Sequence, residues 1–209
     1  HLSRFFIQAQ DAMEYLSKEI MAPILCVGTL RQMDDGTWQE AYCLLSDGKI
    51  LETIPFGKTP VLFEVAGISV LLLPEGAACP VNAKADLIFC PASERWYQGK
   101  EIEVVENLSC MARSLHCSAV YCASTGANDH ALYNGQSFAI SPEGRLSGRL
   151  SAFNQDSLVY DLESQASSKN APAPNEMELL HKALVTALRD YCFKTGMNSA
   201  CLGLSGGID

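Results

Sequence analysis

The chain has 209 residues, of which 48% are hydrophobic and 19% charged, and its formal net charge is −9 at pH 7. This composition excludes disordered, collagen-like and coiled-coil chains and indicates one or two globular domains. The acidic balance argues against a nucleic-acid partner held by a basic surface, so any phosphate binding must be local.

The cysteines, the histidines and the apolar runs bear on compartment and metal binding. Nine cysteines, an odd number without CxxC spacing and many of them in apolar runs, indicate reduced core thiols. His116, His130 and His181 are separate in the sequence, so we expect no metal site. There is no secretory signal pattern and no apolar run of about 20 residues, so we expect a cytoplasmic protein without a membrane partner. Because the chain begins with His1 and not with Met, we expect residues to be missing upstream.

The first half of the chain predicts one helix followed by strands. Apolar residues recur at helical spacing over residues 2–20, which is typical of an amphipathic helix. Asp47-Gly48 and Ala66-Gly67 are turn signals between apolar segments, and each predicts a β-hairpin. The predicted strands are residues 40–45, 49–54, 61–65, 68–73 and a buried strand over 86–91.

The middle of the chain returns to helical spacing and then to strands. Residues 100–117 predict a helix, and residues 118–123 predict a strand. Turn residues on both sides of residues 137–141 predict an antiparallel hairpin there. We therefore expect an α/β domain in which helices cover one face of the sheet.

A change of composition separates this part from the C-terminal segment. Residues 164–175 are rich in Ser, Ala, Pro and Asn without a large apolar side chain, so we interpret them as a linker that cannot order itself by burying area. Asn175 is a suitable N-cap with Glu178 three residues later, and Gly196 is a suitable C-terminal stop. These signals and an apolar stripe predict a helix over residues 176–195.

The last residues combine a strand signal with a glycine-rich loop. Residues 200–204 are an apolar run that predicts a buried strand, and it leads directly into Ser205-Gly206-Gly207-Ile208-Asp209. Two consecutive glycines allow backbone N–H groups to converge on an anion, and the Ser205 hydroxyl can donate to the same oxygens. The lysine of a Walker loop is missing, so the pattern favours phosphate binding of another kind.

This segment resembles the start of the synthetase domain of glutamine-dependent NAD synthetases. The resemblance is carried by Arg189-Asp190-Tyr191, by Lys194-Thr195-Gly196 and by the glycine loop, where that family has an SGGxDS pyrophosphatase motif. It implies ATP with Mg²⁺ as cofactors, and a loop that holds phosphates while a substrate carboxylate is adenylated. The implied ATP-binding residues are Gly203, Leu204, Ser205, Gly206, Gly207, Ile208 and Asp209.

The larger upstream part is similar to the glutaminase domain of the same enzymes, which is a member of the nitrilase family. The similarity is carried by Ala85-Asp86-Leu87-Ile88, Ala92-Ser93, Gly99-Lys100, Gly126-Ala127-Asn128-Asp129 and Tyr133-Asn134-Gly135-Gln136-Ser137. It implies a nitrilase-like αββα sandwich. It also implies that Ser93 and Lys100 hold the glutamine substrate; a strand-end hydroxyl and a helix-start lysine remain the alternative reading.

The catalytic Glu-Lys-Cys constellation of nitrilase-type glutaminases cannot be placed in this sequence. We reject Cys79 as a shifted nucleophile because a reactive thiolate needs a base and a cation nearby. Lys58 is better explained as a solvated turn lysine. Either the glutaminase domain is degenerate, or mobile active-site loops after Gly57 and Leu73 are missing; the intact core pattern favours the second explanation.

Three functional hypotheses follow. The first is a partial glutamine-dependent NAD synthetase that uses glutamine and deamido-NAD and forms a homo-oligomer. Residues 1–163 would be its glutaminase domain, residues 164–175 the linker, and residues 176–209 the start of its ATP-binding domain. The second is a stand-alone nitrilase-like amidase in which the glycine tail is incidental. The third is a catalytically inactive nitrilase-like domain that mediates oligomerisation.

Overall fold

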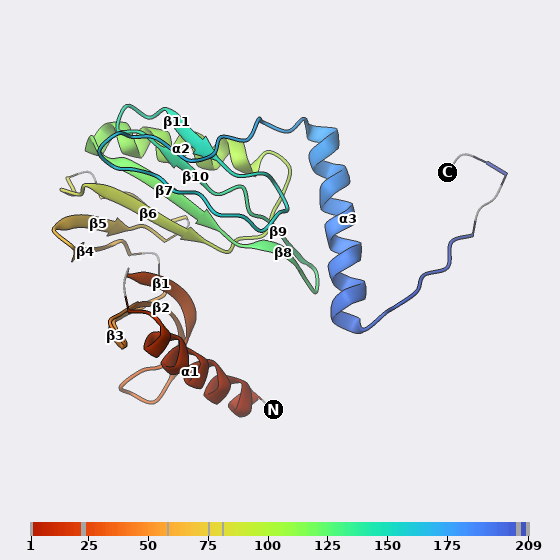
Figure 1. Ribbon diagram of the computed structural model, residues 1–209, viewed down its shortest axis with the longest axis horizontal. Coiled ribbons are helices and arrows are strands. Elements are labelled where there is room, and N and C mark those ends of the chain that lie inside the picture. The colour runs from red at the N-terminus through yellow and green to blue at the C-terminus, as the bar shows by residue number, and fades with distance from the viewer. Residues whose placement is uncertain are drawn as a thin grey trace. The chain divides into compact units, whose positions relative to one another are not determined.

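The computed structural model describes residues 2–21, 24–57, 59–74, 76–80, 82–203 and 206–207. It divides into two compact units, His1–Pro91 and Ala92–Asp209, and each is described by itself (Figure 1). Both units combine helices with sheets, which confirms the predicted α/β class. In the described ranges, no helix is both long enough and apolar enough to cross a bilayer.

The first unit opens with a helix packed on a three-stranded antiparallel sheet. Helix α1 (Leu2–Glu19) is followed by β1 (Leu25–Gln32), β2 (Trp38–Ser46) and β3 (Lys49–Pro55), with β2 between the other two. Met13 of α1 packs against Cys43 and Leu45 of β2. The β2–β3 turn at Asp47-Gly48 has positive φ at both residues, 50° and 74°, as two-residue hairpin turns require.

The rest of the first unit contains the second predicted hairpin and the buried strand. β4 (Val61–Val65) and β5 (Ile68–Leu72) pair antiparallel, and β6 (Leu87–Ala92) pairs parallel with β5. Leu71, Leu72 and Ile88 are almost completely buried, because a parallel pair is normally covered on both faces. The strands of both predicted hairpins and the buried strand are confirmed, with bounds within two residues of the prediction.

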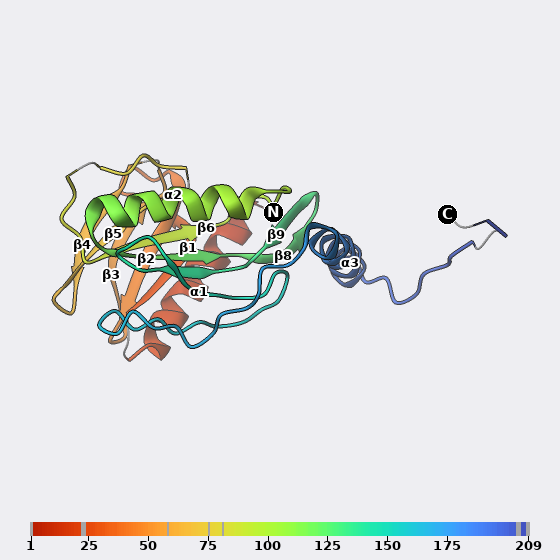
Figure 2. The same ribbon diagram turned by 90° about the horizontal axis from the view of Figure 1, so that it is seen from above.

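In the second unit, a long helix lies along one face of three strands. Helix α2 (Lys100–Leu115) covers β7 (Ser118–Ala123) and β10 (Phe138–Ile140), and β10 also pairs with β11 (Leu146–Arg149) (Figures 1 and 2). Both pairings of β10 are antiparallel. Phe138 is 1% exposed and its ring stacks on that of Tyr121, with centroids 4.9 Å apart. The strand over 118–123 and the hairpin at 137–141 are confirmed.

A separate hairpin and the last helix complete the second unit. β8 (Thr125–Asn128) and β9 (Ala131–Asn134) form a two-stranded sheet, and α3 (Glu176–Thr195) lies beside it in both views (Figures 1 and 2). The bounds of α3 match the prediction. The Asn175 side chain accepts a hydrogen bond from the Glu178 N–H (2.7 Å), and Gly196 ends the helix at φ 73°. The β8–β9 hairpin itself was not predicted.

Part of the predicted linker is held along β11. The Ala171 N–H donates to the Arg149 carbonyl (2.8 Å), and the Ser168 N–H donates to the Val159 carbonyl (2.9 Å). Backbone hydrogen bonds order a segment that lacks large apolar side chains, because each N–H and C=O seeks a partner. The expectation that composition prevents ordering is therefore wrong for these residues. The role of residues 164–175 as a domain boundary stays a prediction.

The predicted strand over residues 200–204 is not observed in its described part. Residues 197–203 form neither helix nor strand, and Cys201 and Leu202 are exposed. A buried strand needs neighbouring strands and cover for both faces, and the described part of the chain supplies neither at this place. Leu204 lies outside the described residues.

Candidate functional site

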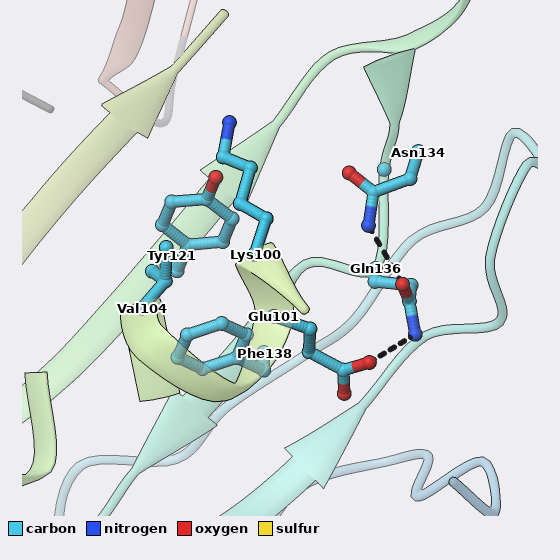
Figure 3. Close-up of a pocket in the computed structure, with 8 residues that line it drawn as sticks. Lys100, Glu101, Val104, Tyr121, Asn134, Gln136 and Phe138 are labelled. Atoms are coloured by element: carbon cyan, nitrogen blue, oxygen red, sulfur yellow. Dashed lines mark hydrogen bonds between the residues drawn. The ribbon is translucent and has the colours of Figure 1, made fainter. Parts of the chain in front are cut away.

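A small pocket opens in the second unit, between the first turn of α2 and the strands below it (Figure 3). Helix α2 supplies one wall, β7 and β10 supply the aromatic floor, and the end of β9 with the turn after it supplies the polar wall. The lining residues are Lys100, Glu101, Val104, Tyr121, Asn134, Gly135, Gln136 and Phe138.

The polar wall is a chain of buried hydrogen bonds. The Asn134 Nδ2 donates to the Gln136 Oε1, and the Gln136 Nε2 donates to the Glu101 Oε2, each at 2.7 Å (Figure 3). Asn134 and Gln136 are 7% and 2% exposed. Gln136 adopts a positive φ of 52° directly after Gly135 at 64°, and this sharp turn directs its amide toward the helix. Satisfied buried amides of this kind hold the wall in one arrangement.

The second oxygen of Glu101 binds an arginine. The Arg149 Nη1 donates to the Glu101 Oε1 at 2.5 Å, and the same guanidinium donates to the Ala171 carbonyl at 3.3 Å. The two side chains are only 12% and 15% exposed, so the ion pair lies largely out of water. The charge on Glu101 is thereby compensated, because a nearly buried charge needs a partner.

Lys100 is buried at the start of α2, where the sequence places a candidate glutamine ligand. It is 3% exposed, and its Nζ donates to the carbonyls of Glu94 (3.1 Å) and Arg95 (3.5 Å). The Glu94 carboxylate lies 3.8 Å away. A cation is electrostatically unfavourable at a helix N-terminus. The two carbonyls offset this cost, so the fold positions a buried ammonium here in spite of the helix.

Ser93 lies on the segment that joins β6 to α2. It is exposed, and it precedes Glu94, whose carbonyl accepts the Lys100 hydrogen bond. In Figure 3 the Lys100 side chain extends past the ring of Tyr121, whereas Glu101 extends toward Gln136. Ser93 and Lys100 therefore share one short segment of the second unit, and their binding of glutamine stays a prediction.

The predicted ATP-binding residues are described only in part. Gly203, Gly206 and Gly207 are exposed, and no heavy atom lies within 4 Å of the position that a Cβ would take at Gly203 or Gly206. Leu204, Ser205, Ile208 and Asp209 lie outside the described residues. The assignment of this segment to phosphates stays a prediction.

Cys79 and Lys58 are the two residues that were weighed for the catalytic constellation. Burial raises the pKa of the Cys79 thiol, which is the reverse of what an activated nucleophile needs. Lys58 lies outside the described residues. The structure thus adds a physical reason against Cys79 as the nucleophile.

Sequence reasoning missed most of the polar wall. Gln136 entered only through the family resemblance, Asn134 entered also as part of a turn signal, and Glu101 was not singled out. The usable signal was a pair of amide residues on either side of Gly135, within an otherwise apolar region. Nothing local marks Glu101, because its partners Gln136 and Arg149 are distant in the sequence.

Comparisons with known proteins find similarity to one group of enzymes, although no protein-family model matches this chain. A protein from Synechocystis sp. is 34% identical over 143 residues, which cover 66% of this chain and 24% of that protein. One from Xylella fastidiosa is 28% identical over 203 residues, which cover 90% of this chain and 37% of that protein. Both relatives are named glutamine-dependent NAD(+) synthetase.

Solved structures agree on the fold. The glutamine-dependent NAD+ synthetase from Acinetobacter baumannii, in complex with ADP, has a TM-score of 0.77 at 22% identity. That likeness covers 90% of this chain and 41% of the other. An amidase of Nesterenkonia sp., from the nitrilase superfamily, has a TM-score of 0.52 at 16% identity. That likeness covers 70% of this chain and 64% of the amidase chain. Identities this low show the fold alone.

The predicted resemblance to glutamine-dependent NAD synthetases is confirmed, and so is the relation of the fold to nitrilase-like amidases. The chain spans 24% to 37% of the length of the two curated relatives described here. The match therefore accounts for only part of each of these relatives.

Proposed function

We propose that this chain is part of an enzyme that amidates deamido-NAD to NAD, with ATP and with ammonia released from glutamine. The observation that carries the proposal is the match to the Xylella fastidiosa synthetase, which covers 90% of this chain. A match of this coverage includes most of the nitrilase-like part and at least part of the segment around α3. A stand-alone amidase would share the nitrilase-like part with a synthetase, but an incidental tail would have no reason to match the segment around α3.

The glutamine site of the proposed enzyme lies in the second unit. The buried ammonium of Lys100, held by the carbonyls of Glu94 and Arg95, would contact the carboxylate of glutamine. Ser93 would donate a hydrogen bond from the same segment. The residues at hand supply binding and orientation, and we assign no nucleophile within them.

The nucleotide site of the proposed enzyme is the segment that follows α3. Residues 203–209 would hold the phosphates of ATP with Mg²⁺, which neutralises part of their charge. The open space around Gly203 and Gly206 supports this role, because phosphate oxygens must approach the backbone closely. Deamido-NAD would react there with ammonia produced in the nitrilase-like part.

The remaining features of the proposal concern the whole protein. We take residues 1–163 as glutaminase part, 164–175 as linker and 176–209 as the beginning of the ATP-binding part. The enzyme would act in the cytoplasm as a homo-oligomer, without nucleic-acid or membrane partners. The acidic net charge of −9 is consistent with the absence of a nucleic-acid partner.

The test measures NAD formation by the protein as its gene encodes it, with deamido-NAD, ATP and Mg²⁺, and with either glutamine or ammonium. We expect product with both nitrogen sources. Lys100→Met should abolish glutamine use and leave ammonium use within about two-fold, since only the first needs the glutamine site. Lys182→Met, which removes an exposed lysine of α3, is the control.

Two results would contradict the proposal, and each would favour another function. Glutamine hydrolysis without any ATP-dependent amidation would favour the stand-alone amidase. The absence of both activities from a folded protein would favour the oligomerisation domain.

A further inference from the structure

Two charged side chains of α3 bind the main chain of one residue of the β8–β9 hairpin, Ala127. The Ala127 N–H donates to the Asp190 Oδ2 at 2.8 Å, and the Lys194 Nζ donates to the Ala127 carbonyl at 2.5 Å. Asp190 and Lys194 are four residues apart, so they lie one above the other on one face of the helix. Both main-chain groups of Ala127 are therefore satisfied by the helix.

The residue before Ala127 is Gly126, and the absence of a side chain there leaves room for the Asp190 carboxylate. Gly126 has a φ of 110°, and a Cβ at this position would stand 3.0 Å from the Asp190 Oδ2. A side chain here would be strained and would push the carboxylate away. The Arg189 Nε also donates to the Asp190 Oδ1 at 2.9 Å, so the carboxylate is held from both sides. We call Asp190, Lys194 and the main-chain N–H and C=O of Ala127 the clamp.

The other edge of the hairpin binds the segment that leads to Lys100. Leu132 of β9 faces Ala127 across the hairpin, and its carbonyl accepts a hydrogen bond from the Trp96 N–H at 2.6 Å. The Trp96 ring packs edge-on against Phe153, with centroids 5.6 Å apart. The hairpin is therefore held between α3 on one edge and residues 93–99 on the other.

This second contact reaches the candidate glutamine site directly. Trp96 follows Glu94 and Arg95, whose carbonyls accept the hydrogen bonds of the Lys100 ammonium. A two-stranded hairpin is marginally stable by itself, so its position depends on what covers its edges. A shift of the hairpin would move the Trp96 backbone and, with it, the two carbonyls that hold Lys100.

We propose that Asp190 and Lys194 are positioning residues for glutamine binding, and that they act through the hairpin and the Trp96 segment on Lys100. The proposal rests on the proposed function, because it takes Lys100 as a glutamine ligand. Helix α3 precedes the predicted nucleotide segment. Through the hairpin, it also helps to hold the glutamine site in position. Asp190 and Lys194 belong to the motif at residues 189–196, and their proposed role is structural. Phosphate binding would not account for it.

The experiment uses the protein as its gene encodes it, with Asp190→Ala and Lys194→Met as disruptive variants. Glu178→Ala and Lys182→Met are matched controls, because they break an exposed ion pair of 2.7 Å on the same helix. Lys194→Arg is the conservative variant, since it keeps a cationic donor. The readouts are KM and kcat for glutamine, the rate with ammonium, and hydrogen exchange at the Trp96 N–H.

We expect the disruptive variants to raise the glutamine KM about ten-fold with kcat within about two-fold, the pattern of a lost binding contribution. The Trp96 N–H should exchange faster in both, and ammonium-dependent synthesis should stay unchanged. Lys194→Arg should restore most of the affinity. The double variant should be no worse than the more affected single one, because both side chains act on the main chain of one residue.

An unchanged glutamine KM, or an equal loss of glutamine-dependent and ammonium-dependent rates, would overturn the positioning role. If the unsubstituted protein neither hydrolyses glutamine nor forms NAD, the proposed function fails instead. Hydrogen exchange then still decides the structural part: unchanged exchange at Trp96 in Asp190→Ala, relative to Glu178→Ala, would show that the clamp does not position the segment.

Discussion

The pocket below α2 and the glycine segment after α3 are organised in opposite ways. In the pocket, Phe138 and Gln136 are almost fully buried, and each polar side chain of the wall has a hydrogen-bond partner in the protein. In the glycine segment, residues 197–203 and 206–207 are exposed and form no helix or strand. The pocket is therefore shaped by the core, whereas the described glycine segment has no comparable core around it.

This difference separates two kinds of mutational effect. A substitution in the pocket acts on a packed interior, so it changes the free energy of unfolding as well as ligand binding. A substitution in the glycine segment removes no packing, so it should change binding alone. Substitutions in helix α3 should be of both kinds. One part of the helix is packed in a core cluster, and another part binds the hairpin through charged side chains.

The largest expected effect is a loss of protein stability when a residue of the pocket is substituted. Phe138→Ala should lower the free energy of unfolding by about 3–5 kcal/mol, because it removes a buried ring and leaves a cavity. Phe193→Ala, at a ring that is 84% exposed, is the control and should change stability by less than about 0.5 kcal/mol. Urea unfolding of both variants measures the contrast, and similar losses would show that the pocket is not part of a cooperative core.

The next effect is on nucleotide binding without a change of stability. Gly206→Val should weaken binding of ATP with Mg²⁺ more than about ten-fold, because its side chain would occupy the approach of the phosphates. Unfolding should be unaffected, since the site of the new Cβ is open. Gly57→Val, at another open glycine, is the control. Calorimetric titration decides the matter, and equal ATP affinity in both variants would remove Gly206 from the site.

The smallest effect is a dependence on pH at the clamp. Burial raises the pKa of Asp190, but hydrogen bonds from the Ala127 N–H and the Arg189 side chain outweigh it and hold the pKa below its ordinary value. The resulting stabilisation is present above the unfolded pKa, about 3.9, and is lost as the pH falls through the folded pKa. The stability difference between the unsubstituted protein and Asp190→Asn should therefore be constant from pH 5 to 7 and shrink below about pH 4. A difference that stays constant down to pH 3 would contradict this assignment.

Local signals were sufficient for many of the elements. Asp47-Gly48 and Ala66-Gly67 adopt positive φ angles, and both turns connect the predicted strands. Asn175 and Gly196 bound α3 as expected. These features depend on residues a few positions apart, and backbone sterics and capping act at that range.

Patterns that need distant partners were less predictable. The apolar run at residues 200–204 suggested a strand, but its described part forms none, because a strand exists only through its neighbours. The β8–β9 hairpin was overlooked for a related reason: its edges are satisfied by Asp190, Lys194 and Trp96, which lie far from it in the sequence.

The sequence by itself determined the α/β class, the position of α3 and the resemblance to glutamine-dependent NAD synthetases. Each of these follows from periodicity, capping or motif residues that are close together in the chain. Only the tertiary structure decided that Lys100 is buried, that Glu101 joins Gln136 to Arg149, and that α3 holds the hairpin. The physical reason is that a buried charge or amide must find its partner in space, and the order of residues does not specify which partner that is.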